Sequence, residues 1–88
     1  MIERQATIVN QEGLHARPAA RIVRMASAFA AEITLSKDGM DVNGKSIMGV
    51  MMLAAECGSE ITIRATGPDA EQAVQALAEL VANGFGED

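Results

Sequence analysis

The sequence contains few aromatic residues, one cysteine and no long apolar run. Two Phe and no Trp or Tyr occur among its 88 residues, so the core of the folded chain must be aliphatic. The chain therefore lacks the stacking platforms of proteins that bind single-stranded nucleic acids, and its net charge of −5 disfavours a phosphate backbone. We expect no nucleic-acid partner, and an acidic protein of this size is better suited to basic protein surfaces.

The single cysteine, Cys57, excludes an intramolecular disulfide and leaves no thiolate cluster for zinc. A single histidine likewise makes a metal site unfavourable, and we expect neither a metal nor a cofactor. The N-terminal stretch MIERQATIVN lacks the apolar region of a signal peptide, and no apolar run reaches the length of a membrane span. These features predict a cytoplasmic protein without membrane insertion.

The chain is long enough for one domain, residues 1–88, because a second hydrophobic core would not fit. Its composition, 49% hydrophobic and 22% charged, is typical of a folded chain. Apolar and β-branched patterns predict strands at 5–9, 32–37, 40–42 and 60–66. Helical spacing predicts amphipathic helices at 16–28 and 70–82. The apolar run SIMGVMML predicts a short helix of about two turns that Ser46 opens, with Gly58 ending the segment.

Short motifs mark the ends of several of these elements. Asp38-Gly39 is a hairpin-turn signal between the second and third strands. Gly67-Pro68-Asp69 is a turn, and Asp69 followed three positions later by Gln72 predicts a capping box for the last helix. Asn83-Gly84 is typical of a helix stop.

The order strand, helix, strand, strand, helix, strand, helix predicts an α+β fold. A small sheet with alternating strands has one face for helices and one for water. The expected architecture is an open-faced β-sandwich, a four-stranded antiparallel sheet with three helices on one face (βαββαβα). The strands become antiparallel when the last strand lies between the first two.

The only histidine, His15, lies at a Gly-Leu turn just before the first predicted helix. If that helix begins at Ala16, His15 is its N-cap, and the backbone N–H groups of Ala16 and Arg17 lack intrahelical partners. Such a helix end favours an anion, and the guanidinium of Arg17 can bind two phosphate oxygens at once. The set of groups is suited to a phosphoryl group held on imidazole.

The residues alone leave two other interpretations of His15 open. It can be a solvated histidine at a helix start, or an acid–base group of an enzyme, although no nucleophile or second acid is placed with it. Its protonation is also open, because the helix end favours neutral imidazole whereas the neighbouring Glu12 favours imidazolium.

Three segments, GLHARPAA, NGKSIMGVMMLAAECGSEI and TGPDAEQAVQAL, together resemble the HPr family. This family comprises the histidine-containing phosphocarriers of the bacterial phosphoenolpyruvate-dependent phosphotransferase system (PTS). The resemblance runs the length of the chain and implies the same open-faced sandwich. It implies that His15 accepts a phosphoryl group on Nδ1 from phosphorylated enzyme I and passes it to a histidine of enzyme IIA domains, with Arg17 assisting. The protein would then be a carrier, a substrate of PTS enzymes rather than an enzyme, and we expect a monomer.

Ser46 opens the short helix, where its hydroxyl predicts an N-cap. The segment KSIMGVM resembles HPr proteins regulated by HPr kinase/phosphorylase, which implies phosphorylation of Ser46. A phosphoserine adds about −1.5 to −2 charges and would weaken the binding of a partner that is suited to the neutral hydroxyl.

The short helix carries apolar side chains around most of its circumference, so some of them must be exposed. Methionine adapts to several partners, which favours a docking surface over a simple core helix. We expect a docking patch around His15 made of Ala20, Ile47, Met48 and Met51.

The branch of the PTS and the role of His15 both leave alternatives. Glu12 lies where many relatives carry a small polar residue, and Ala54-Ala55 with the NGFGED tail resembles proteobacterial members and the nitrogen-related branch. A purely regulatory module that acts through phosphorylated Ser46, with His15 idle, is the alternative function, although such relatives lack the histidine. A third is an acylphosphatase-like hydrolase on a similar fold.

Overall fold

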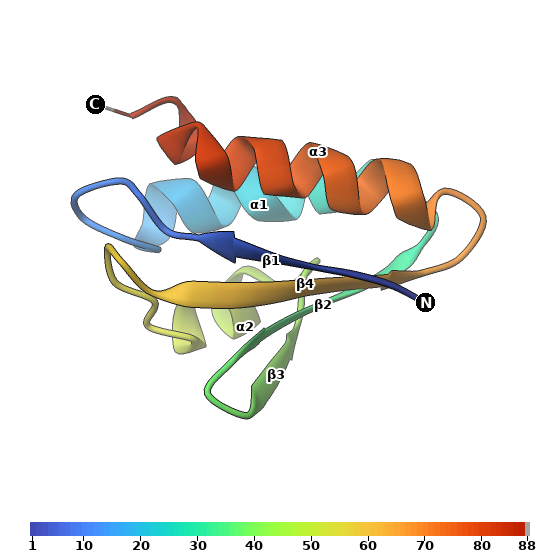
Figure 1. Ribbon diagram of the computed structural model, residues 1–88, viewed down its shortest axis with the longest axis horizontal. Coiled ribbons are helices and arrows are strands. Elements are labelled where there is room, and N and C mark those ends of the chain that lie inside the picture. The colour runs from blue at the N-terminus through green and yellow to red at the C-terminus, as the bar shows by residue number, and fades with distance from the viewer. Residues whose placement is uncertain (88) are drawn as a thin grey trace.

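The strands pair into one four-stranded antiparallel sheet, and three helices cover one of its faces (Figure 1). The computed structural model describes residues 1–87. Its elements in chain order are β1 (Ile2–Thr7), α1 (Ala16–Ser27), β2 (Glu32–Lys37), β3 (Met40–Asn43), α2 (Ile47–Met52), β4 (Glu60–Thr66), α3 (Ala70–Ala82) and the 3-10 turn η1 (Gly84–Gly86). The predicted α+β open-faced sandwich is confirmed.

The strand order is β1-β4-β2-β3, with every pair antiparallel. The prediction that the last strand lies between the first two is therefore confirmed. Alternation along β4 directs Ile61, Ile63 and Ala65 toward the helices, where all three are buried. On the uncovered face, Nε of Arg64 in β4 lies 3.2 Å from Oε1 of Glu3 in β1. Apolar side chains of β4 thus face the helices and the charged side chain of Arg64 faces solvent, as the alternating sequence predicts.

The predicted bounds of the first strand are wrong. β1 covers Ile2–Thr7 rather than residues 5–9, because its polar first half pairs with β4 from Ile2 onward and needs no apolar pattern of its own. Ile8 leaves the strand but stays fully buried. α2 ends at Met52, about two turns after Ser46 as expected and well before Gly58, since Leu53 is its C-cap and Ala54 adopts a left-handed φ of 51°.

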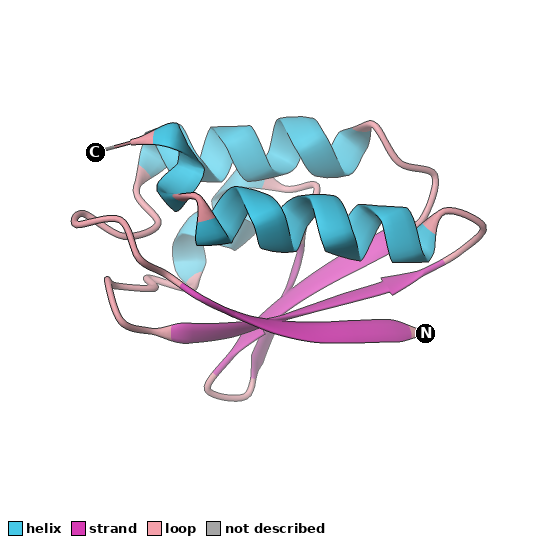
Figure 2. Ribbon diagram, turned by 45° about the horizontal axis from the view of Figure 1, so that its top comes forward, coloured by secondary structure: helices cyan, strands magenta, loops and turns pink. Residues whose placement is uncertain are grey.

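The core lies between the sheet and the two long helices, α1 and α3, which run across it side by side (Figure 2). It is aliphatic as expected, with Phe85 of η1 as its only buried aromatic ring among residues 1–87. In that part of the chain the helices are all too short or too polar to cross a membrane.

The predicted capping box at α3 is wrong. The side chain of Asp69 makes no cap hydrogen bond, and its two carboxylate oxygens instead accept the backbone N–H groups of Ala30 and Ala31, each at 2.8 Å. The hydrogen bond from Ala30 lowers the pKa of Asp69 most; desolvation opposes it, and the hydrogen bond from Ala31 and the charge of Lys45 add to it. Asp69 thus joins the start of α3 to the loop that enters β2.

The lowered pKa of Asp69 predicts a loss of stability in acid. The folded chain stabilises the ionised carboxylate of Asp69. The stability gained from this is fully present above pH 3.8, the ordinary pKa of Asp, and is lost as the pH falls through the lower pKa of the folded state. Asp69→Asn should lower the melting temperature at neutral pH and flatten the acid limb, measured by thermal unfolding from neutral to strongly acidic pH. Asp38→Asn, at an exposed turn position, is the control, and an acid limb equally flat in both variants would contradict the assignment.

Candidate functional site

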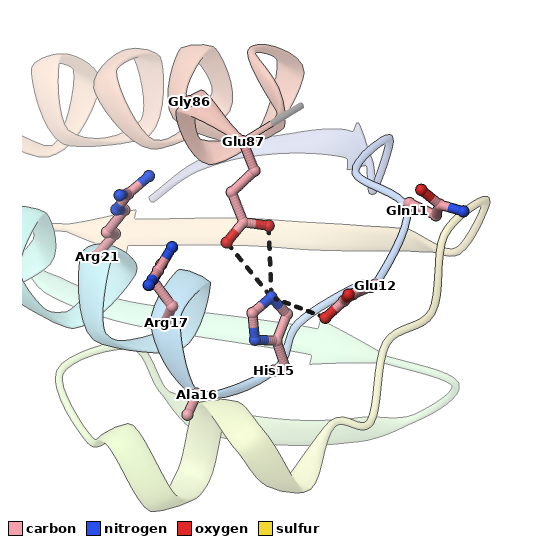
Figure 3. Close-up of a pocket in the computed structure, with 8 residues that line it drawn as sticks. All are labelled: Gln11, Glu12, His15, Ala16, Arg17, Arg21, Gly86 and Glu87. Carbon is pink, nitrogen blue, oxygen red and sulfur yellow. Dashed lines mark hydrogen bonds and ion pairs between the residues drawn. The ribbon is translucent and has the colours of Figure 1, made fainter.

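His15 stands at the edge of an open hollow of about 690 Å³ at the N-terminal end of α1 (Figure 3). Its backbone is the extended N-cap of that helix, as predicted, and its ring makes no capping hydrogen bond. The side chain is 37% exposed, so the imidazole is accessible. The hollow is lined by Gln11, Glu12, His15, Ala16, Arg17, Arg21, Gly86 and Glu87.

The start of α1 supplies free backbone donors beside the ring. The first hydrogen bond of the helix runs from the N–H of Ala19 to the carbonyl of His15, at 3.0 Å. Within residues 1–87 the N–H groups of Ala16 and Arg17 have no acceptor, as the sequence predicts for the first turn of a helix. The guanidinium of Arg17 lines the same hollow, so an anion there meets a cation and two unpaired N–H groups.

The turn before His15 is fixed by its own neighbours. Gly13 has a φ of +73°, and a Cβ at this position would lie 2.5 Å from the carbonyl oxygen of Ala55, so only glycine fits. The N–H of Leu14 donates to that same oxygen at 2.8 Å. The buried Asn10 donates from Nδ2 to the carbonyl of Gly13, also at 2.8 Å. The loop after α2 thereby holds the entry to α1.

A carboxylate that the sequence analysis did not foresee lies against the imidazole. The turn η1 brings Glu87 back over the hollow, with its two oxygens 3.3 and 3.4 Å from Nε2 of His15 (Figure 3). The Glu12 carboxylate, which was foreseen, lies farther from the same nitrogen, at 3.9 Å, and is 78% exposed. The only sequence signal for Glu87 was a lone Phe between two glycines after a helix stop, which is typical of a chain that folds back.

The charge of Glu87 is set by its surroundings. Partial burial of the carboxylate opposes ionisation, but hydrogen bonds from His15 and Asn10, with the charges of His15 and Arg17, outweigh it and lower the pKa of Glu87. An ionised Glu87 carboxylate is an acceptor only, so its contact with His15 is a hydrogen bond only when Nε2 carries a proton. The other ring nitrogen, Nδ1, points toward the first turn of α1 (Figure 3).

The second predicted site, Ser46, is the N-cap of α2. Its Oγ accepts the backbone N–H of Gly49 at 3.1 Å, so the predicted capping role is confirmed. The neighbouring Lys45 donates from Nζ to the carbonyl of Phe29 at 2.8 Å, just after the end of α1.

The predicted apolar surface exists on α2, which packs against α1. Only Val50 of this helix is buried, and Met48 is 71% exposed. Ala20 is half-buried on the neighbouring helix. The exposed large side chains of α2 are Ile47, Met48, Met51 and Met52, so the surface includes one methionine more than predicted.

The family model for the PTS HPr component phosphorylation site matches residues 2–83. The chain belongs to the HPr family of the PTS. It is similar to the phosphocarrier protein HPr of Cupriavidus necator, 48% identical over 87 residues that cover 99% of this chain and 98% of that protein. It is also similar to the HPr-like protein Crh of Halalkalibacterium halodurans, 46% identical over 81 residues, which cover 92% of this chain and 96% of that one.

A solved structure gives the same result for the fold. HPr-C-His from Thermoanaerobacter tengcongensis is similar with a TM-score of 0.96 and 45% sequence identity, covering 100% of this chain and 99% of that one. The family resemblance inferred from the three sequence segments is thus confirmed along nearly the whole chain. HPr-family proteins are phosphocarriers, which gives the geometry around His15 a chemical context.

Proposed function

We propose that His15 accepts a phosphoryl group on Nδ1 from phosphorylated enzyme I and passes it to a histidine of an enzyme IIA domain. One observation carries the proposal: the ring is accessible and its Nδ1 points toward the first turn of α1, where the N–H groups of Ala16 and Arg17 are free and Arg17 lines the same hollow. Phosphoryl oxygens placed there would meet donors on two sides. The protein acts as a carrier in the cytoplasm, needs no cofactor and works as a monomer.

The transfer step needs little from the carrier beyond position and charge. The lone pair of Nδ1 attacks phosphorus, the P–N bond of the phosphorylated donor histidine breaks, and its electron pair returns to the donor ring. Arg17 and the helix end stabilise the negative oxygens during the passage. The reverse step releases the group to the IIA histidine, so the protein is a substrate of PTS enzymes rather than an enzyme.

Labelling with phosphoenolpyruvate and enzyme I should give an acid-labile phosphoprotein that is absent in His15→Ala. Arg17→Ala should slow the transfer about ten- to hundredfold, because it removes one charged hydrogen-bonding group from the phosphoryl oxygens. Arg64→Ala removes a positive charge from the uncovered face of the sheet and should transfer at the wild-type rate. Acid-stable label, or label that survives His15→Ala, would overturn the proposal.

Regulatory phosphorylation of Ser46 by HPr kinase/phosphorylase is the second part of the proposal. Ser46 is half-buried at the N-cap of α2, next to the exposed apolar side chains of that helix. A phosphate there places uncompensated charge where a partner would bury apolar surface.

Two substitutions at Ser46 separate charge from capping. Aspartate caps a helix as well as serine, so Ser46→Asp should keep the wild-type stability while slowing transfer from enzyme I at least about fivefold. Ser46→Ala removes the cap, costing about 1 kcal/mol of the free energy of unfolding, and should transfer normally. Rates are measured by phosphoryl transfer and stability by denaturant unfolding. Equal transfer by wild type and Ser46→Asp would remove the regulatory proposal.

The docking patch for enzyme I and IIA domains is proposed to comprise Ala20, Ile47, Met48 and Met51. Met48→Glu should raise the KM of enzyme I for the carrier about tenfold and leave kcat unchanged, because it charges the surface without touching the hollow. Met40→Glu alters an exposed methionine of β3, outside the patch, and is the matched control. NMR shift perturbation by enzyme I confined to the uncovered sheet face would reject the patch.

The second candidate is a regulatory module that acts through phosphorylated Ser46, and it is favoured by the similarity to Crh, the catabolite repression HPr of Bacillus subtilis. Labelling with ATP and the kinase, but not with phosphoenolpyruvate and enzyme I, would select it. A panel of IIA acceptors from sugar permeases and from the nitrogen-related branch would assign the pathway that receives the phosphoryl group.

A further inference from the structure

We propose that Glu87 is a positioning residue for His15: its carboxylate accepts the Nε2 proton, leaves Nδ1 as the lone-pair nitrogen, and balances the charge that the ring gains on phosphorylation. The inference rests on the proposed transfer through Nδ1 and adds a residue to it. It is carried by the two contacts of 3.3 and 3.4 Å between Nε2 and the carboxylate oxygens.

The segment that delivers Glu87 is held in place. Three successive residues, Gly84, Phe85 and Gly86, have φ values of 63°, 60° and 73°. A left-handed conformation is unfavourable for a residue with a side chain, and here the burial of the Phe85 ring offsets that cost. Arg21 of α1 donates from its guanidinium to the carbonyl of Phe85. Glu87 therefore follows an anchored turn that is tied to the same helix as His15.

The carboxylate itself is also held. Asn10 donates from Nδ2 to Glu87 at 3.2 Å and to the carbonyl of Gly13 at 2.8 Å, so one buried amide connects Glu87 to the turn before His15. The Glu87 side chain is only 17% exposed, which strengthens its contact relative to the exposed Glu12. The charged groups that line the hollow around the ring are these two carboxylates, from the preceding loop and the segment after η1, and the guanidinium groups of Arg17 and Arg21, both from α1.

The contact acts on the transfer step through the ring proton. A neutral imidazole with its proton on Nε2 can attack phosphorus only with the lone pair of Nδ1. As the new P–N bond forms and the donor P–N bond breaks, the proton stays on Nε2 and the ring becomes positive. The Glu87 carboxylate faces that charge at hydrogen-bond distance. When the group leaves, the electron pair returns to Nδ1 and the ring is neutral again.

The first test measures the ring tautomer in the unphosphorylated protein by ¹⁵N NMR, at a pH where His15 is neutral. Glu87→Ala should lower the ratio of the Nε2–H to the Nδ1–H tautomer about three- to tenfold, because it removes one charge-assisted hydrogen bond at a partly exposed site. Glu12→Ala, which removes the same charge from the exposed side, should leave the ratio unchanged. An unchanged ratio in Glu87→Ala, or equal changes in both variants, would overturn the inference.

The second test follows transfer from phosphorylated enzyme I. Glu87→Ala should lower kcat about three- to tenfold with KM unchanged, because the docking surface on α2 is intact. A rise in KM alone would make Glu87 a docking contact and overturn the inference. The tautomer ratio is measured without any PTS enzyme, so it tests the contact between Glu87 and His15 by itself. A wild-type protein that accepts no label from enzyme I would refute the proposed function, whatever the tautomer ratio shows. Wild-type amide shifts of the sheet in Glu87→Ala would exclude misfolding as the cause.

Discussion

The N-terminal end of α1 is the physical feature on which the rest of the site depends. The first N–H groups of a helix have no partner within the helix. In α1 no side chain among residues 1–87 caps them, so they remain free beside the imidazole of His15. A serine or aspartate in the place of His15 would accept a hydrogen bond from one of these donors and so remove it from the proposed anion site. The weak capping ability of histidine is thus what keeps the donors free.

The turn into α1 is held by contacts with segments that are distant in the sequence. The interior of the fold is almost entirely aliphatic, and the backbone contacts of this turn are with the loop after α2. Gly13 makes this approach feasible because a Cβ would collide with Ala55. Asn10 then links the turn to the segment after α3, so three stretches that are distant in sequence meet around one ring.

The electrostatics of the site balance two opposite needs. The chain is acidic as a whole, yet the phosphoryl group that we propose for His15 needs positive charge, which the helix end and Arg17 would supply locally. Glu87 lies on the Nε2 side of the ring, whereas Nδ1 points toward the first turn of α1. In the proposed phosphorylated state a negative group would lie on each side of the ring, and the positive charge of the imidazole between them would offset their repulsion.

The sequence by itself determined the features that depend on near neighbours along the chain. Apolar periodicity gives the long helices and the three later strands, and the roles of His15 as N-cap of α1 and Ser46 as N-cap of α2 follow from the residues beside them. Tertiary structure alone decided three features: the hydrogen-bond partners of Asp69, the extent of β1, and the contact between Glu87 and His15. Glu87 and His15 are separated by 72 positions, and no local pattern encodes which side chains a folded-back segment will meet. That outcome follows from how the buried Phe85 and the packed helices fix the path of the chain.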